Sequence, residues 1–267
     1  MAGTEGEGGE KDIARFADLV SRPDEEIPLD EAALLIAAQA RPDLEVGAEL
    51  VRLDELAAGC PQASFDGLLR YLFTDLGFRG NTEHYSDPDN SYLDQVVRRR
   101  LGIPITLSVV TMEVGRRLGV PVAGVGMPGH FLIRDGTDAT AFADPFSGGR
   151  RLDAEGSREI FTNLGGVDWD ESYLAPVGAR AIVSRMLLNL QGLFLPSDLR
   201  GAAWVLEMRL AIPGLPVPER LGLARALGSL GRFGPAAVEL EKVAAELPPE
   251  EATTVATEAT ALRARSN

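Results

Sequence analysis

The sequence is poor in the residues that form disulfides and bind transition metals. Its 267 residues include one cysteine, Cys60, and two histidines, His84 and His130. A single thiol cannot form an internal disulfide, and so few thiol and imidazole groups exclude cysteine-rich and multi-histidine metal sites. We therefore expect no metal, no cofactor and no disulfide framework.

Basic residues and long apolar runs are also scarce. Lysine and arginine total 26 against 40 aspartates and glutamates, which gives a net charge of -14. This charge repels phosphate backbones and anionic lipid, and the triplet Arg98–Arg100 fits a solvated helix face. No apolar run approaches the roughly 20 residues of a membrane span, and residues 1–12 lack the apolar core of a secretory signal. We predict a cytoplasmic protein that binds neither nucleic acid nor membranes, with a disordered tail over residues 1–11.

Helical periodicity dominates the first part of the remaining chain. Apolar residues recur at helical spacing over residues 13–78. We expect Asp30 to cap a helix within this segment and Ser91 to cap a later helix. Pro104 suits the first turn of another helix, and Gly119 suits its end.

The pattern then changes to short β-rich runs. They occupy residues 120–126, 130–134 and 140–144, and their connections are too short for helical crossovers. We expect three antiparallel strands. Helices followed by strands indicate an α+β fold.

Beyond residue 180, small and apolar residues recur at a fixed period. Ala203 and Ala237 lie 34 residues apart, a period typical of tetratricopeptide repeats. Two copies are fewer than the roughly three of a freestanding solenoid, so this region packs on the first domain or is capped by residues 250–264. A generic pair of helical hairpins is the alternative. We predict two hairpins over residues 180–248 and domains spanning 12–176 and 177–267.

Two polar residues mark the predicted strands. His130 opens one strand and Asp144 ends the next, so a hairpin would place them side by side. An imidazole oriented by a carboxylate supplies two of the three members of a nucleophile–base–orienter triad. In the absence of a nucleophile, the same pair can brace the sheet edge or line a ligand groove.

The segments around this pair form a recognisable set. They are Phe78–Asn81, Tyr85, Asp87–Pro88, Asn90–Leu93, Gly102–Ser108, Gly124–Phe131 and Asp144–Phe146. Together they resemble the Sir B-type transglutaminase-like family, over about residues 30–250. The resemblance implies a papain-like transglutaminase core, with a central helix packed on a small antiparallel sheet, followed by all-α tetratricopeptide-like repeats. It also implies that His130 and Asp144 are the histidine and aspartate of the family triad.

The third member of that triad is missing. The resemblance places the family's cysteine nucleophile at the start of the central helix, where this chain has Pro104. Thr106 and Ser108 are alternative nucleophiles, although Thr106 points about 200° away from Pro104 and Ser108 lies about one turn deeper. Cys60 lies far upstream, and its sequence context is typical of a structural cysteine.

Further polar residues could line the same cleft. They are Asn81, Tyr85, Asp87 and Asn90, with Pro104 and Gly129, although Asn and Asp are equally typical of turns. His84 fits a loop position. We predict a non-catalytic transglutaminase-like protein that binds or scaffolds a protein or peptide partner. The alternatives are a hydrolase or acyltransferase that uses His130 and Asp144 with Ser108, Thr106 or water, and an assembly module without a ligand.

Overall fold

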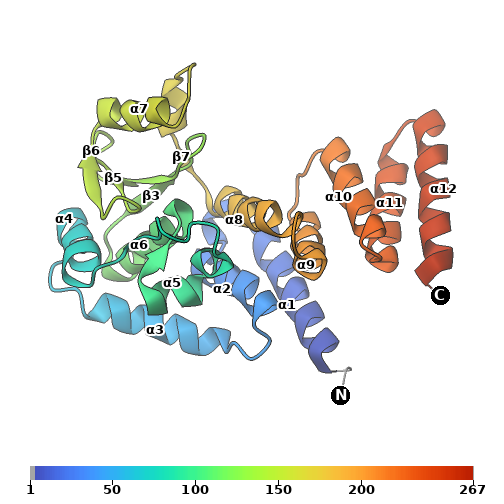
Figure 1. Ribbon diagram of the computed structural model, residues 1–267, viewed down its shortest axis with the longest axis horizontal. Coiled ribbons are helices and arrows are strands. Elements are labelled where there is room, and N and C mark those ends of the chain that lie inside the picture. The colour runs from blue at the N-terminus through green and yellow to red at the C-terminus, as the bar shows by residue number, and fades with distance from the viewer. Residues whose placement is uncertain (1–3, 267) are drawn as a thin grey trace. The chain divides into compact units, whose positions relative to one another are not determined.

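The computed structural model describes residues 4–266, which divide into two compact units (Figure 1). One unit comprises residues 23–186, and the other combines the chain up to Arg22 with residues from Leu187 onward. The division falls inside helix α8 (Ala179–Phe194) and differs from the predicted boundary between residues 176 and 177. The N-terminal segment belongs with the C-terminal helices, which a boundary placed by composition alone does not reveal.

Helix α1 (Thr4–Ser21) extends through most of the segment where we expected a disordered tail. Residues 1–3 of that tail lie outside the described residues. The apolar side chains of Phe16, Leu19 and Val20 are buried, and α1 packs against α9 (Leu199–Leu210). Once tertiary packing fixes these turns, extending the helix upstream costs far less than nucleating it, so glutamate- and glycine-rich residues join it.

The larger unit is built around α6 (Pro104–Leu118), which contacts helices on one side and strands on the other. Most of the α6 residues are buried. The surrounding helical elements are η1 (Asp24–Glu26), α2 (Leu29–Ala40), α3 (Val46–Ala58), α4 (Phe65–Leu69), the π-helical turn η2 (Arg70–Asp75), η3 (Pro88–Ser91) and α5 (Leu93–Arg99).

The ends of α6 are those that the sequence predicts. Pro104 begins the helix, where its missing N–H breaks no hydrogen bond, and Gly119 ends it with a φ of 70°. The caps predicted at Asp30 and Ser91 are wrong, because α2 begins after Pro28 and α5 after a cap at Tyr92. The Asp30 carboxylate instead accepts hydrogen bonds from Arg116 and Arg117 of α6, a long-range contact that local sequence does not encode.

A five-stranded antiparallel sheet covers α6, in the order β6-β5-β4-β3-β7. The three predicted strands are present as β3 (Val122–Val125), β4 (Leu132–Asp135) and β5 (Phe142–Asp144), joined by β6 (Arg150–Leu152) and β7 (Pro176–Val177). A two-stranded parallel pair, β1 (Arg79–Gly80) and β2 (Leu101–Gly102), precedes α6. The arrangement confirms an α+β fold with a small antiparallel sheet.

Helices α6 and α7 (Ala154–Asn163) lie on opposite sides of this sheet (Figure 1). Val125 pairs with Leu132 in the sheet register, and both side chains pack with Phe142 and with Phe161 of α7. Because side chains alternate along a strand, this register fixes which residues face α7 and which face α6.

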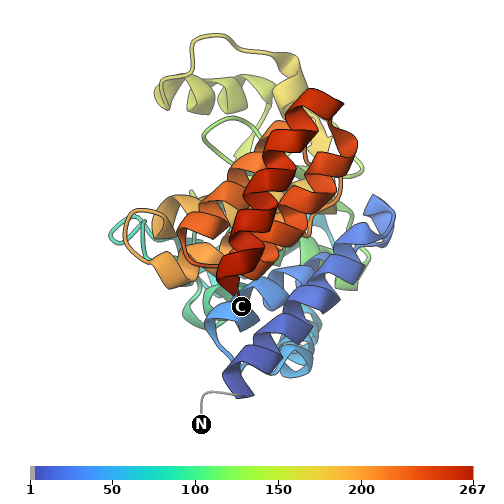
Figure 2. The ribbon, with the colours of Figure 1, turned by 90° about the vertical axis from the view of Figure 1, so that its right-hand side faces the viewer.

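The second unit is helical. It contains the last turns of α8, then α9, α10 (Val217–Ser229), α11 (Phe233–Glu246) and α12 (Pro249–Ser266), the last three lying side by side (Figure 2). Leu199 and Phe233, which begin α9 and α11, are 34 residues apart, and Ala203 and Ala237 are buried in these helices. The tetratricopeptide assignment of this region stays a prediction.

A large side chain at position 237 should destabilise this unit. Ala237 is fully buried, so Ala237→Trp should lower the free energy of unfolding by about 1–3 kcal/mol through overpacking. Urea denaturation measures the change, with Ala256→Trp on the exposed face of α12 as the matched control, expected within about 0.5 kcal/mol of wild type. An unchanged midpoint for Ala237→Trp would contradict the close helix contact at this position.

Candidate functional site

His130 and Asp144 lie side by side, as the hairpin pattern predicts. The His130 Nε2 atom is 3.0 Å from the Asp144 Oδ1 atom, and the two residues are 9% and 2% exposed. Asp144 lies two residues after Phe142, and His130 two residues before Leu132. Alternation along the strands therefore directs both side chains to one face of the hairpin.

The Asp144 carboxylate is the centre of a hydrogen-bond network. Its oxygens also accept from the Phe146 N–H at 3.0 Å and from the Ser147 hydroxyl at 2.7 Å. Burial by itself would raise the pKa of Asp144, but the hydrogen bonds and charge of His130, together with Ser147, outweigh burial and hold this pKa below its usual value. An ionised carboxylate accepts a hydrogen bond from the Nε2–H group, so in the neutral ring Nδ1 is the nitrogen with a free lone pair.

Two aromatic side chains, Phe146 and Tyr85, lie beside the His130–Asp144 pair. The Phe146 ring meets the His130 ring edge-on at a centroid distance of 6.2 Å and the Tyr85 ring at 5.8 Å. A Cβ atom on Gly80 would overlap the Phe146 ring, so glycine at this position lets the ring settle against the backbone of β1. Tyr85 is 53% exposed, which leaves part of its ring free beside the site.

Arg185 of α8 holds the loop that carries His130. Its guanidinium donates to the Met127 carbonyl at 2.9 Å and to the His130 carbonyl at 2.8 Å, and it lies over the Phe131 ring. Burial lowers the pKa of Arg185, against the opposing effect of the Tyr85 phenol, while burial raises the pKa of Tyr85. Sequence reasoning missed Arg185, because its partners lie more than fifty residues away along the chain.

Asn81 and Asn90, which were predicted to line the cleft beside His130, are buried within their own loop. The Asn81 amide donates to the Asn90 side chain at 2.9 Å, and the Asn90 amide donates to the carbonyl of His84. The carbonyl of Asn90 accepts from the Thr106 hydroxyl, which ties the loop to the first turn of α6. These contacts assign both asparagines to holding the loop in place.

Asp87 and Gly129 also stabilise the local backbone conformation near the site. The Asp87 carboxylate caps η3 through the Asp89 N–H and forms an ion pair with Arg99. Gly129 has a φ of 77°, a conformation that favours glycine, and a Cβ there would lie 3.7 Å from the Leu164 side chain. Leu164, which follows α7, therefore lies next to the His130 loop.

A family model described as the transglutaminase-like superfamily matches residues 36–188. The chain belongs to the transglutaminase-like superfamily. It is 42% identical over 196 residues to a UPF0162 protein of Xylella fastidiosa, covering 68% of this chain and 70% of the relative. It is 35% identical over 176 residues to UPF0162 protein PA3419 of Pseudomonas aeruginosa, covering 62% of this chain and 64% of that protein.

A more distant likeness extends to a human protein. This transglutaminase-like chain is 30% identical over 137 residues to F-box only protein 21 of Homo sapiens, covering 48% of the chain and 21% of that protein. No solved structure matches the chain. The predicted transglutaminase-like core is thus confirmed at the level of the superfamily.

The hydroxyl groups nearest to the predicted nucleophile position in this transglutaminase-like core are engaged elsewhere. Pro104 and the fully buried Thr106 and Ser108 lie in the first turns of α6. Thr106 donates to the Asn90 carbonyl at 2.7 Å, and Ser108 donates to the Pro104 carbonyl at 2.8 Å. Within residues 4–266, neither hydroxyl is hydrogen-bonded to His130.

In the described part of the chain, the thiol of Cys60 is not hydrogen-bonded to His130. Cys60 is half-buried after the end of α3, and its Sγ atom lies 3.5 Å from the Gln62 carbonyl. In the part of the chain that the structure describes, no set of three or more histidine, cysteine, aspartate or glutamate side chains is placed to hold a metal ion. Over the same residues, no helix combines the length and apolar character needed to cross a bilayer.

Proposed function

We propose that this transglutaminase-like protein binds a protein or peptide segment at the surface around His130 and Asp144 and does not catalyse acyl transfer. The observation that carries the proposal is an intact, oriented imidazole–carboxylate pair combined with Pro104 at the start of α6. Covalent acyl transfer needs a nucleophilic side chain within reach of the base, and proline supplies none.

The same pair is suited to holding a ligand. The His130 ring keeps Nδ1 available to accept a hydrogen bond from a backbone N–H, while Asp144 fixes the orientation of the ring. Tyr85 adds an exposed aromatic surface beside it. Arg185 holds the loop that carries His130 through two hydrogen bonds to its carbonyl groups. The surface is therefore ordered before a ligand binds, and binding costs less free energy than it would if the loop had to become ordered. The likeness to F-box only protein 21 also supports a protein-interaction role.

The proposal extends to the second unit and to the setting of the protein. We place the protein in the Sir B-type group and in the cytoplasm. We assign α9–α12 to tetratricopeptide-like hairpins that serve as a scaffold for the partner, because α9 and α11 begin 34 residues apart.

Peptide display tests this function directly. Displayed random peptides selected on the wild-type protein should lose at least tenfold in affinity on His130→Gln and on Tyr85→Ala, since both variants remove contacts at the proposed surface. Glu55→Gln, at an exposed position of α3, is the control and should bind as wild type does. Failure to select any peptide that discriminates these variants would contradict the proposal.

An activity assay provides the second arm. The wild-type protein should show no transamidation and no amide hydrolysis on glutamine-containing peptides. Turnover that is abolished by His130→Ala or by Ser108→Ala would instead support the hydrolase or acyltransferase alternative and would overturn the binding proposal.

A further inference from the structure

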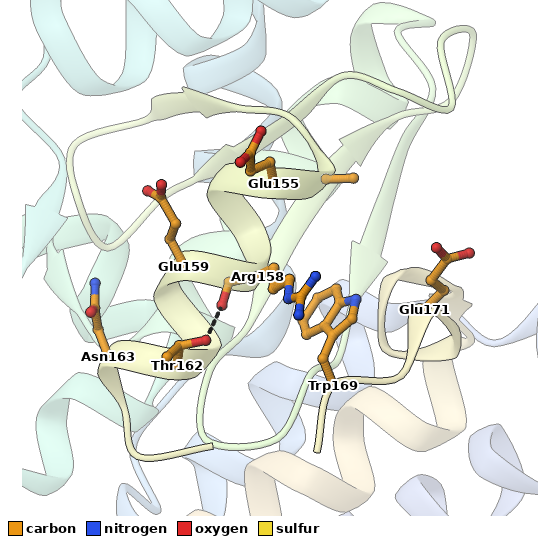
Figure 3. Close-up of a pocket in the computed structure, with 8 residues that line it drawn as sticks. Glu155, Arg158, Glu159, Thr162, Asn163, Trp169 and Glu171 are labelled. Carbon is orange, nitrogen blue, oxygen red and sulfur yellow. Dashed lines mark hydrogen bonds between the residues drawn. The ribbon is translucent and has the colours of Figure 1, made fainter. Parts of the chain in front are cut away.

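A surface pocket of about 630 Å³ lies outside the His130 site, between α7 and the turn η4 (Glu171–Leu174). Figure 3 shows Glu155, Arg158 and Glu159 projecting from α7, Glu171 on the other side, and the Trp169 indole between them. No function assigned above uses this pocket.

The Trp169 indole is held in a fixed orientation. Its ring lies 5.5 Å from the Phe161 ring and 5.8 Å from the Tyr173 ring, both in edge contacts. Phe161 is buried in the core between α7 and the sheet, and the indole packs against it. The indole itself stays partly exposed at the pocket. A fixed indole is the aromatic group that attracts a cation most strongly.

The charged groups of the pocket are not neutralised by one another. Glu155, Glu159 and Glu171 form no salt bridge with any of the described residues, and neither does Arg158. By contrast, carboxylates such as Asp30 and Glu239 are paired with arginines. Three carboxylates and one guanidinium give the pocket a negative balance, on a chain whose net charge is -14.

We propose that this pocket binds the side-chain ammonium or guanidinium of a lysine or arginine in a partner polypeptide. The carboxylates and the indole supply the attraction, and the negative charge of the whole chain favours the approach of a basic segment. The inference names the chemistry of the partner and therefore rests on the proposed function.

The pocket is connected to the His130 loop through neighbouring residues. Asn163, which lines the pocket, is followed by Leu164, and Leu164 lies next to Gly129. A segment bound across His130 therefore has a route over Leu164 that brings one of its basic side chains to Trp169. Because the carboxylates are exposed, a single side chain should bind with a dissociation constant only in the millimolar range.

Nuclear magnetic resonance of the full-length protein tests the inference with tetralysine as the probe. The indole N–H signal of Trp169 is assigned by comparison with Trp204→Phe, because the chain has two tryptophans. This signal should shift in a saturable way with tetralysine and stay unchanged with tetra(acetyl-lysine), which lacks the charge. No saturable shift with tetralysine would overturn the inference.

Charge variants distinguish binding at the pocket from a general electrostatic attraction to the acidic protein. The double variant Glu155→Gln, Glu171→Gln should weaken tetralysine binding at least fivefold, whereas Arg158→Gln should strengthen it. The double variant Glu45→Gln, Glu55→Gln makes the same change of net charge at two exposed positions, one beside α3 and one within it, and should leave binding within twofold of wild type. Equal weakening by this control would show that only the net charge acts and would overturn the pocket.

His130→Gln separates the inference from the proposed function. This variant should leave the tetralysine shift at Trp169 unchanged, because the pocket residues are intact. Loss of displayed-peptide binding on His130→Gln tests the proposed function alone. A pocket that binds tetralysine in a protein that selects no peptide at His130 would therefore contradict only the proposed function.

Discussion

The thiol installed by Pro104→Cys should react with iodoacetamide about tenfold faster than Cys60 at pH 6, through a lowered thiol pKa. Position 104 is the first residue of α6, where the helix N-terminus favours a thiolate, and the family resemblance places His130 opposite this turn. Replacing the proline should cost little stability, since proline is favoured but not required at a first helical turn. Mass spectrometry of the alkylated peptides resolves the two sites.

His130→Ala provides the decisive comparison. In the Pro104→Cys background it should remove most of the rate advantage, because the imidazolium no longer stabilises the thiolate. The single variant Cys60→Ser serves as a control for reagent access elsewhere. An installed thiol that reacts no faster than Cys60 would mean that α6 begins in a different place relative to His130 than the resemblance implies.

The sequence predicted a structural feature correctly where that feature depends on the backbone preferences of the residue itself or of its near neighbours. Pro104 and Gly119 bound α6 because their preferred φ values suit the two ends of a helix. The adjacency of His130 and Asp144 followed in the same way, from alternation within two short strands joined by a turn.

The sequence did not predict the role of a residue whose contact partner lies far away along the chain. Asp30 resembles a helix cap, but its carboxylate accepts from Arg117, which lies 87 residues away. Arg185 reads as one arginine in an ordinary amphipathic helix, although it holds the His130 loop. Residues 4–11 contain no apolar side chain, yet α1 passes through them because packing is supplied further along the helix, at Phe16.

The buried cluster at Glu113 shows how such long-range contacts also shape pH dependence. Burial and the nearby charge of Asp30 raise the pKa of Glu113 to about 6, although Arg116 and Arg117 oppose this shift. A folded-state pKa above the ordinary value means that the protonated form is favoured in the folded protein. Its contribution to stability is therefore present at low pH and is lost as the pH rises toward 6.

Removal of the Asp144 side chain should be the most destabilising single change at the site. Asp144→Ala leaves three donors without an acceptor, on His130, Phe146 and Ser147. Each unsatisfied buried donor costs about 1–3 kcal/mol, and the exposed Ser147 hydroxyl can turn to water, so we expect a total loss of about 2–4 kcal/mol in the free energy of unfolding. Asp168→Ala, at an exposed aspartate in the loop after α7, is the matched control and should change stability by less than about 0.5 kcal/mol.

The pH dependence of Asp144→Asn distinguishes a charged anchor from a space-filling one. The pKa of Asp144 is lowered in the folded protein, so its charge contributes stability above the unfolded-state pKa and loses it as the pH falls through the folded-state value. The difference in unfolding free energy between wild type and Asp144→Asn should therefore shrink as the pH falls below about 4. Urea midpoints measured across this range test the expectation. A difference that does not vary with pH would show that the carboxylate is held by its hydrogen-bond geometry alone, and that His130 is not oriented by its charge.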